Sequence, residues 1–365
     1  MTMRSNIITI LVLLTLCMTV HGQSKEQLVS EIRKAYSAAK QKMADNGKGA
    51  NPRLDMIVSL NDGEEIGEDF SIIDETELTF YFDKVRRFRD DNFFDDDVCY
   101  FIVANWSAHG HTRYREMLFD PKDGHLLFTY THYETDAGVP FDSRFYYDAN
   151  GKVIEQLHKV RNQSASGVEL EEMKSEQGEK TLADSYLNVF NGVMNPAKEW
   201  EDGPVRKTTP KADRMKFIRS TYVQAKQKME KDAKAEVPHN MTITVHDQED
   251  GDTPPLTTEI KYFFEQQQEG GENTNHCYFI TTRRQSMYID NYSEYLFEPR
   301  RPELIFGYEC AREEGEKYEF RYYFDENQRC IERQEATTEE GYDNSFNIKK
   351  SARDYLKVLS QICGR

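Results

Sequence analysis

Two stretches decide the fold: CYFIVANWSAHGHTRYREMLFDPKDGHLLFTY at Cys99–Tyr130 and CYFITTRRQSMYIDNYSEYLFEPRRPELIFGY at Cys277–Tyr308. They align without a gap over 32 residues, and 12 positions are identical. Unrelated segments of this length would share roughly two. The second half of the chain is therefore a diverged copy of the first.

Each copy is predicted to open with an amphipathic helix. Apolar residues recur at steps of 3, 4, 3 and 4, and the same steps return 186 residues later: Val29, Ile32, Tyr36, Ala39 and Met43, then Met215, Ile218, Tyr222, Ala225 and Met229. That spacing places five apolar side chains on one helix face. Ser24 with Gln27 predicts a capping box for the first helix, and Thr209 before Pro210 predicts a cap and a first-turn proline for the second.

Short runs of alternating polarity follow each helix, which is the pattern of β-strands. Two sets of three apolar residues match between the copies and would each share one strand face: Leu78, Phe80 and Phe82, then Ile260, Tyr262 and Phe264. Turn sequences such as 148–151 separate the runs, and short loops between successive strands predict an antiparallel meander. We expect an α+β fold of two tandem copies. Each would pack an N-terminal helix on a meander of about seven strands and close with a C-terminal helix, near 182–193 and 352–362.

The N-terminus has the features of a signal peptide. Arg4 precedes an apolar run at Ile7–Val20, and small residues at Val20 and Gly22 favour cleavage after Gly22. The run is shorter than the roughly 20 residues of a membrane-spanning helix. We therefore expect residues 1–22 to be removed, leaving an exported chain, periplasmic or extracellular, without a transmembrane segment. Its parts would be repeat domain 1 at 23–195, a linker at 196–209 and repeat domain 2 at 210–365.

The formal net charge of −17 excludes some classes of partner. Nucleic acids and anionic membrane surfaces are bound by clustered Lys and Arg, which displace counterions. An acidic chain is poorly suited to either, so we expect no nucleic-acid partner.

Five cysteines remain in the expected mature chain, and exported proteins pass through compartments where disulfides persist. Cys99 has no other cysteine in its own copy, so a bridge from it would have to reach the second. Cys277 is its equivalent, and a Cys99–Cys277 disulfide is the specific hypothesis. The alternative is that these cysteines are small buried apolar residues.

His109 and His111 have the only metal-like spacing. Imidazoles at i and i+2 can face the same way on an extended segment, and the aspartates at 95–97 would supply a carboxylate. The second copy has Met287 and Ile289 at the histidine positions. The alternative is a solvated loop.

Phe93 and Phe94 stand inside an acidic segment. If exposed they would form a contact for a ligand or protein partner, because adjacent apolar rings seldom remain in water. Trp106 is the third candidate for such contact. The alternative is that Phe93 and Phe94 turn back into the core.

Motifs for nucleophilic catalysis, zinc proteases, phosphate loops and redox cysteine pairs are absent from the sequence. We expect no cofactor. The residues Cys277–Thr281 with Tyr295–Phe297, following a helix that ends AKQKM at Met229, resemble exported proteins of unknown function from gut Bacteroidales. This resemblance implies bacterial export and transfers no functional residue.

Two hypotheses of function follow. The first is a non-catalytic binding or structural protein of the cell envelope that holds a glycan, a peptide or an envelope protein. The second is a hydrolase of glycans or peptides with carboxylates in a cleft between the copies. Since the histidine pair, the two adjacent phenylalanines and the extra cysteines occur in one copy only, a site is expected where one copy has diverged or between the two.

Overall fold

The structure is a computed structural model that describes residues 24–65, 71–89, 92–108, 111–134, 138–160, 163–164, 176–195, 205–235, 239–248, 255–269, 272–287, 289–299, 301–313, 316–336 and 345–363. The predicted signal peptide at residues 1–22 lies outside these ranges. No helix in the described ranges is long and apolar enough to cross a membrane.

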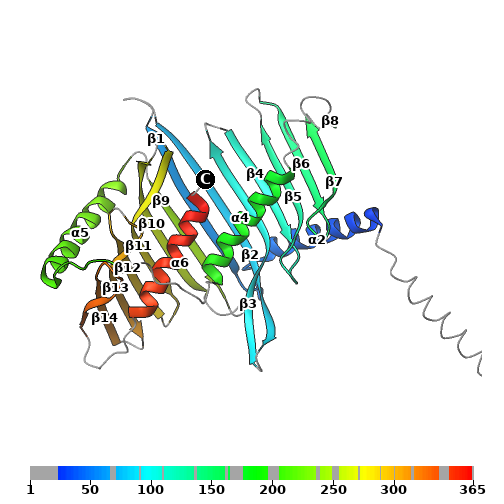
Figure 1. Cartoon of the computed structure of the whole chain (residues 1–365). Helices are drawn as coiled ribbons and strands as arrows, with labels where there is room; N and C mark the ends of the chain where they lie inside the picture. The colour runs from blue at the N-terminus through cyan, green and yellow to red at the C-terminus, as the bar shows by residue number, and fades with distance from the viewer. Residues whose placement is uncertain are drawn as a thin grey trace, which may run out of the picture.

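Helices and strands follow one another in two similar series (Figure 1). The first is α2 (Lys25–Asp45), β1 (Leu54–Glu65), β2 (Ser71–Arg89), β3 (Asn92–Ala108), β4 (His111–Phe119), β5 (Leu126–Glu134), β6 (Pro140–Tyr147), β7 (Val153–Val160), β8 (Gln163–Ser164) and α4 (Glu176–Met194). The second is α5 (Lys211–Asp232), β9 (Asn240–Asp247), β10 (Leu256–Glu269), β11 (Glu272–Gln285), β12 (Ile289–Phe297), β13 (Leu304–Glu313), β14 (Glu316–Phe324), β15 (Cys330–Glu335) and α6 (Ser345–Cys363). The α+β class and the antiparallel meanders are confirmed.

All the strands in the described residues belong to one antiparallel sheet. Its order is β15-β14-β13-β12-β11-β10-β9-β1-β2-β3-β4-β5-β6-β7-β8, so each copy is a meander and the copies meet where β1 pairs with β9. The two-residue β8 only extends the first meander. We call the β1–β9 pairing the seam, because it joins the two repeats into one sheet. The sequence did not predict it.

The seam has an approximate two-fold axis. Val58 pairs with Leu78 on β2, and Ile243 pairs with Ile260 on β10, the residue that matches Leu78. Val58 and Ile243 are thus equivalent, and they also pair with each other across β1 and β9. Equivalent residues face each other at the centre of the seam, as they do at the interface of a symmetric dimer.

Helices cover both faces of the sheet (Figure 1). α4 and α6 lie side by side on one face, above a single apolar core that takes residues from both copies, such as Phe190 and Tyr322. They approach closely at Gly192, where an added Cβ would lie 3.0 Å from Val358. The linker predicted at 196–209 therefore lies between the two repeats in the sequence, but the repeats share one apolar core on this face of the sheet.

The other face carries α2 over the first copy and α5 over the second, each above its own smaller apolar cluster. The predicted capping box of α2 is present, with Gln27 N donating to Ser24 Oγ at 3.2 Å. The predicted cap of α5 is wrong: Pro210 is the N-cap residue, and Thr209 Oγ1 donates to Glu326 at 2.6 Å instead.

Candidate functional site

Several of the predicted site residues cannot be placed. His109 lies outside the described residues. The structure describes the backbone but not the side chains of Phe93 and Phe94 on β3 and of His111 on β4. Trp106 is half-buried on β3, and the guanidinium of Arg115 lies 4.8 Å from the centre of its ring. The structure gives Trp106 a packing partner within its own copy.

The structure does not contain the hypothesised Cys99–Cys277 disulfide: both cysteines are buried, and no bond joins their sulfur atoms. Cys99 Sγ lies 3.7 Å from Phe101 O, and Cys277 Sγ lies 3.6 Å from Phe279 O. Their strands, β3 and β11, are five steps apart in the sheet, about 24 Å at about 4.8 Å per step. A disulfide requires Cα atoms within about 7 Å. Burial also raises the pKa of the Cys99 thiol, which keeps it protonated.

A buried glutamate with three donors occurs under the N-terminal helix of each copy. In the second copy Glu294 accepts from Tyr222 Oη on α5 at 2.7 Å, from Lys226 Nζ at 2.8 Å and from Tyr292 Oη at 2.8 Å. The first copy repeats the arrangement with Glu116 accepting from Tyr36, Lys40 and Tyr114. Sequence reasoning missed these clusters, although Tyr114 and Glu116 are among the 12 identical positions.

The polar groups of these clusters already bond to one another. Burial, followed by the hydrogen bond to Glu294, raises the pKa of Tyr222, and burial and the charge of Glu294 raise the pKa of Tyr292. Both phenols therefore remain neutral donors, while the carboxylate accepts from a lysine as well. Such a network holds a helix on a sheet and leaves little capacity for a ligand.

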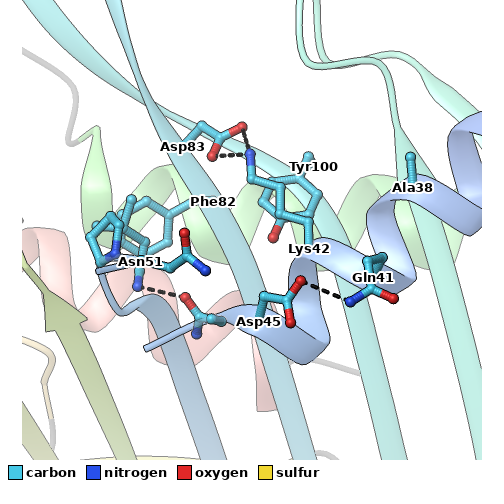
Figure 2. Close-up of a pocket in the computed structure, with 11 residues that line it drawn as sticks. Ala38, Gln41, Lys42, Asp45, Asn51, Phe82, Asp83 and Tyr100 are labelled. Atoms are coloured by element: carbon cyan, nitrogen blue, oxygen red, sulfur yellow. Dashed lines mark hydrogen bonds and ion pairs between the residues drawn. The ribbon is translucent and has the colours of Figure 1, made fainter. Parts of the chain in front are cut away.

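A pocket of about 440 Å³ opens between the C-terminal half of α2 and the sheet of the first copy (Figure 2). α2 and the loop after it supply one wall, and β1, β2 and β3 supply the floor. The lining residues are Ala38, Gln41, Lys42, Asp45, Asn46, Asn51, Pro52, Leu54, Phe82, Asp83 and Tyr100. Amides, carboxylates and one ammonium thus surround the Tyr100 ring.

The charged side chains of the pocket are paired among themselves. Lys42 Nζ contacts both oxygens of Asp83 and lies 4.5 Å from the centre of the Tyr100 ring. Gln41 Nε2 donates to Asp45 at 2.8 Å. Figure 2 shows the Lys42–Asp83 and Gln41–Asp45 contacts as dashed lines.

Comparison of the copies explains why the pocket is open. In the second copy the hydroxyl of Tyr278, the equivalent of Tyr100, donates to Asp232 Oδ2 at 2.9 Å. Asn46 stands at the position of Asp232, but it turns away to bond Leu54 N at 2.9 Å. The Tyr100 hydroxyl has no hydrogen-bond partner among the described residues, and Figure 2 shows it directed into the pocket.

The rear of the pocket connects to the seam. Asn46 Nδ2 donates to Asp55 at 2.8 Å, and the same carboxyl is contacted by Arg53 Nε at 3.0 Å and by His246 Nδ1 of the second copy at 2.6 Å. Asp55 is 4% exposed. Burial opposes its ionisation, but the hydrogen bonds from His246 and Arg53 outweigh burial and hold its pKa below the usual range. Asn46, the residue that keeps the pocket open, is thus held by a carboxylate that also contacts a histidine of the second copy.

A third cluster brings Asp120, Asp123 and His125 within 4.8 Å of one another in the turn between β4 and β5. The turn itself uses these groups, since Asp120 accepts from Lys122 N at 2.7 Å and Asp123 accepts from His125 N at 3.2 Å. The second copy has Arg301 at the position of Asp123. The cluster is explained by turn formation.

The pocket under α2 offers groups for a ligand: the available hydroxyl and the ring of Tyr100, and the amides of Gln41 and Asn51. The Phe82 ring is 1% exposed and packs against Phe190 of α4 on the other face of the sheet. Rings with polar groups at their edge bind small polar molecules that have an apolar face. In comparisons with known proteins, no protein-family model, curated protein or solved structure matches this chain.

Proposed function

We propose that this chain is an exported, non-catalytic binding protein, and that its ligand enters the pocket under α2. The available hydroxyl of Tyr100 carries the proposal, because a buried tyrosine normally finds a hydrogen-bond partner within the protein. In the second copy that partner is Asp232. A ligand acceptor would take this role in the first copy.

The ligand proposed is a small neutral polyhydroxylated molecule, such as the end of a glycan. The Lys42–Asp83 contact balances two of the charges, so the lining does not select strongly for a charged ligand. Hydroxyl groups would exchange hydrogen bonds with Gln41, Asn51 and Tyr100, and one face of a sugar ring would lie on an aromatic ring. The volume of about 440 Å³ lies within the range of small-molecule pockets, about 300 to 1,000 Å³.

Binding is favoured over hydrolysis by the state of the two carboxylates in the pocket. Glycoside hydrolysis needs one carboxylic acid and one carboxylate that are both available to the substrate. Asp83 is held by Lys42, and Asp45 accepts from Gln41. Neither is arranged to transfer a proton to a ligand.

Two matched variants test the proposal. Calorimetric titration of residues 23–365 with glucose, galactose, mannose, N-acetylglucosamine and their disaccharides should reveal a ligand. Tyr100→Phe should weaken its binding at least 10-fold with little change in melting temperature. Tyr278→Phe should leave binding unchanged and lower the melting temperature, because it loses the bond to Asp232. Binding by Tyr100→Phe equal to that of the unmodified chain, or no binding of any sugar, would reject the proposal.

A further inference from the structure

We propose a second binding site, independent of the saccharide pocket, for a small carboxylate that carries a ring. It is a pocket of about 280 Å³ between the N-terminal half of α2 and strands β5 and β6. Its lining residues are Arg33, Tyr36, Ser37, Phe128, Tyr130, Arg144 and Tyr146. Two guanidinium groups and four aromatic rings thus meet in one small space.

Arg144 is the residue that recognises the anion. Its guanidinium lies 5.2 Å from the centre of the Tyr130 ring, and it forms no salt bridge within the described part of the chain. The nearest carboxyl along its strand, Asp142, is occupied by Tyr130 Oη at 2.7 Å and His132 Nδ1 at 2.9 Å. A guanidinium in a pocket that lacks a carboxylate partner is suited to bind one from a ligand through two parallel hydrogen bonds.

The second copy has the same arginine, there in a loose contact with a glutamate that Lys317 also holds. Arg321 pairs with Tyr308 across β14 and β13, as Arg144 pairs with Tyr130 across β6 and β5, and its guanidinium lies 5.5 Å from the Tyr308 ring. Arg321 also lies 3.7 Å from Glu319, which stands at the position of Asp142. The stacked arginine is therefore common to both copies, and only the first leaves its charge without a salt bridge.

The rest of the pocket favours a negative ligand with a flat apolar body. Arg33 donates to Tyr146 Oη at 3.2 Å and to Glu155 at 3.2 Å, so its charge is matched by one carboxylate and that of Arg144 remains. The Phe128 ring lies 4.9 Å from those of Tyr36 and Tyr146, and forms an apolar wall with them. The lining holds two guanidinium groups and no carboxylate, so an anion in the pocket can approach the guanidinium of Arg144 directly.

The test is calorimetric titration of residues 23–365 with benzoate and with glucuronate at low ionic strength, with sodium sulfate as the anion that lacks a ring. Binding of benzoate or glucuronate that weakens as NaCl is raised is the expected result, and the two ligands distinguish an apolar ring from a sugar ring. Arg144→Gln should weaken that binding at least 10-fold, and Arg321→Gln should leave it unchanged.

A second variant keeps the proposal testable if Arg144→Gln fails to fold. Ser37→Glu places a carboxylate on the exposed rim of the pocket without removing packed atoms, and should weaken anion binding by a similar factor while the melting temperature holds. The proposal is overturned if neither ring-bearing carboxylate binds at 10 mM, if sulfate binds as tightly as they do, or if Arg144→Gln and Ser37→Glu both bind like the unmodified chain.

Discussion

Replacing Glu294 by alanine tests whether the two copies are one folding unit. The Glu294 side chain is 5% exposed and accepts from two tyrosine hydroxyls and from Lys226. Removing one member of a buried charged network costs about 3 to 5 kcal/mol, because the remaining groups lose their partner but stay away from water. Lys226 is 36% exposed and can regain water, so we expect a loss of about 4 kcal/mol.

The corresponding shift in melting temperature follows from the size of the folded chain. Unfolding entropy is about 2.1 cal/mol/K per residue, which for the roughly 280 residues that the structure describes gives about 0.6 kcal/mol/K. A loss of about 4 kcal/mol then lowers the melting temperature by about 7 °C. Glu294→Gln keeps the shape and one acceptor oxygen but loses the charge, and should lower it by about half as much.

The assay records melting by far-ultraviolet circular dichroism and by tryptophan fluorescence. Trp106 lies on β3 of the first copy, so its fluorescence, recorded in a Trp200→Phe background that removes the other tryptophan, reports on the first copy. Because one apolar core takes residues from both copies, damage at Glu294 should shift both signals together. Separate transitions, with fluorescence unmoved, or a shift below about 2 °C, would refute the reasoning.

Three further predictions concern single positions. Burial raises the pKa of Asp97 to about 6, and the positive charge of Lys84 opposes this shift only in part. Asp97 is therefore protonated in the folded protein at acidic pH, and the protein loses stability as the pH rises from about 4 through 6. Asp97→Asn should therefore raise the melting temperature more at pH 7.5 than at pH 4, and an equal change at both would contradict the assignment. Gly307→Ala should cost about 1 to 3 kcal/mol in urea unfolding, because the new Cβ would lie 2.9 Å from Ile348 Cδ1; adding Ile348→Val should recover part of the loss. Alkylation of the native chain should label the exposed Cys330 within minutes and the buried Cys99 only after unfolding, as read by peptide mass spectrometry.

The meanders and their helices could be predicted because their causes are local. Alternation of polarity, turn residues and 3.6-residue periodicity act within one copy, and duplication gave each pattern twice. The seam between β1 and β9 depends on pairing of strands about 185 residues apart, and no local signal specifies it. A description as two separate domains followed naturally from the repeat and could not anticipate the shared core.

The candidate site could be predicted less well, because the sequence analysis selected histidines, cysteines and paired phenylalanines, the residue types that most often form sites. The pocket instead arises from one difference between the copies, an asparagine in place of an aspartate. When the alignment of the two N-terminal helices is continued three residues past Met43, Asn46 in the first copy aligns with Asp232 in the second. That difference becomes meaningful only with the knowledge that Asp232 bonds Tyr278 and that Asn46 turns to Asp55, contacts between residues distant in sequence.

Fusion of the copies permits an asymmetry that a symmetric dimer cannot have. Around the seam axis, the pair of Asp55 and His246 is related to the pair of Asn240 and Asn61. The first pair joins His246 Nδ1 to the Asp55 carboxylate at 2.6 Å, and the second is an amide contact, with Asn61 Nδ2 donating to Asn240 Oδ1 at 3.2 Å. In a dimer of identical chains both ends would carry the same residues. Here the charged end also holds Asn46 and the open pocket, so divergence changed the seam and the pocket at the same end. We infer that the pocket of the first copy depends on a residue of the second, which a single repeat could not supply.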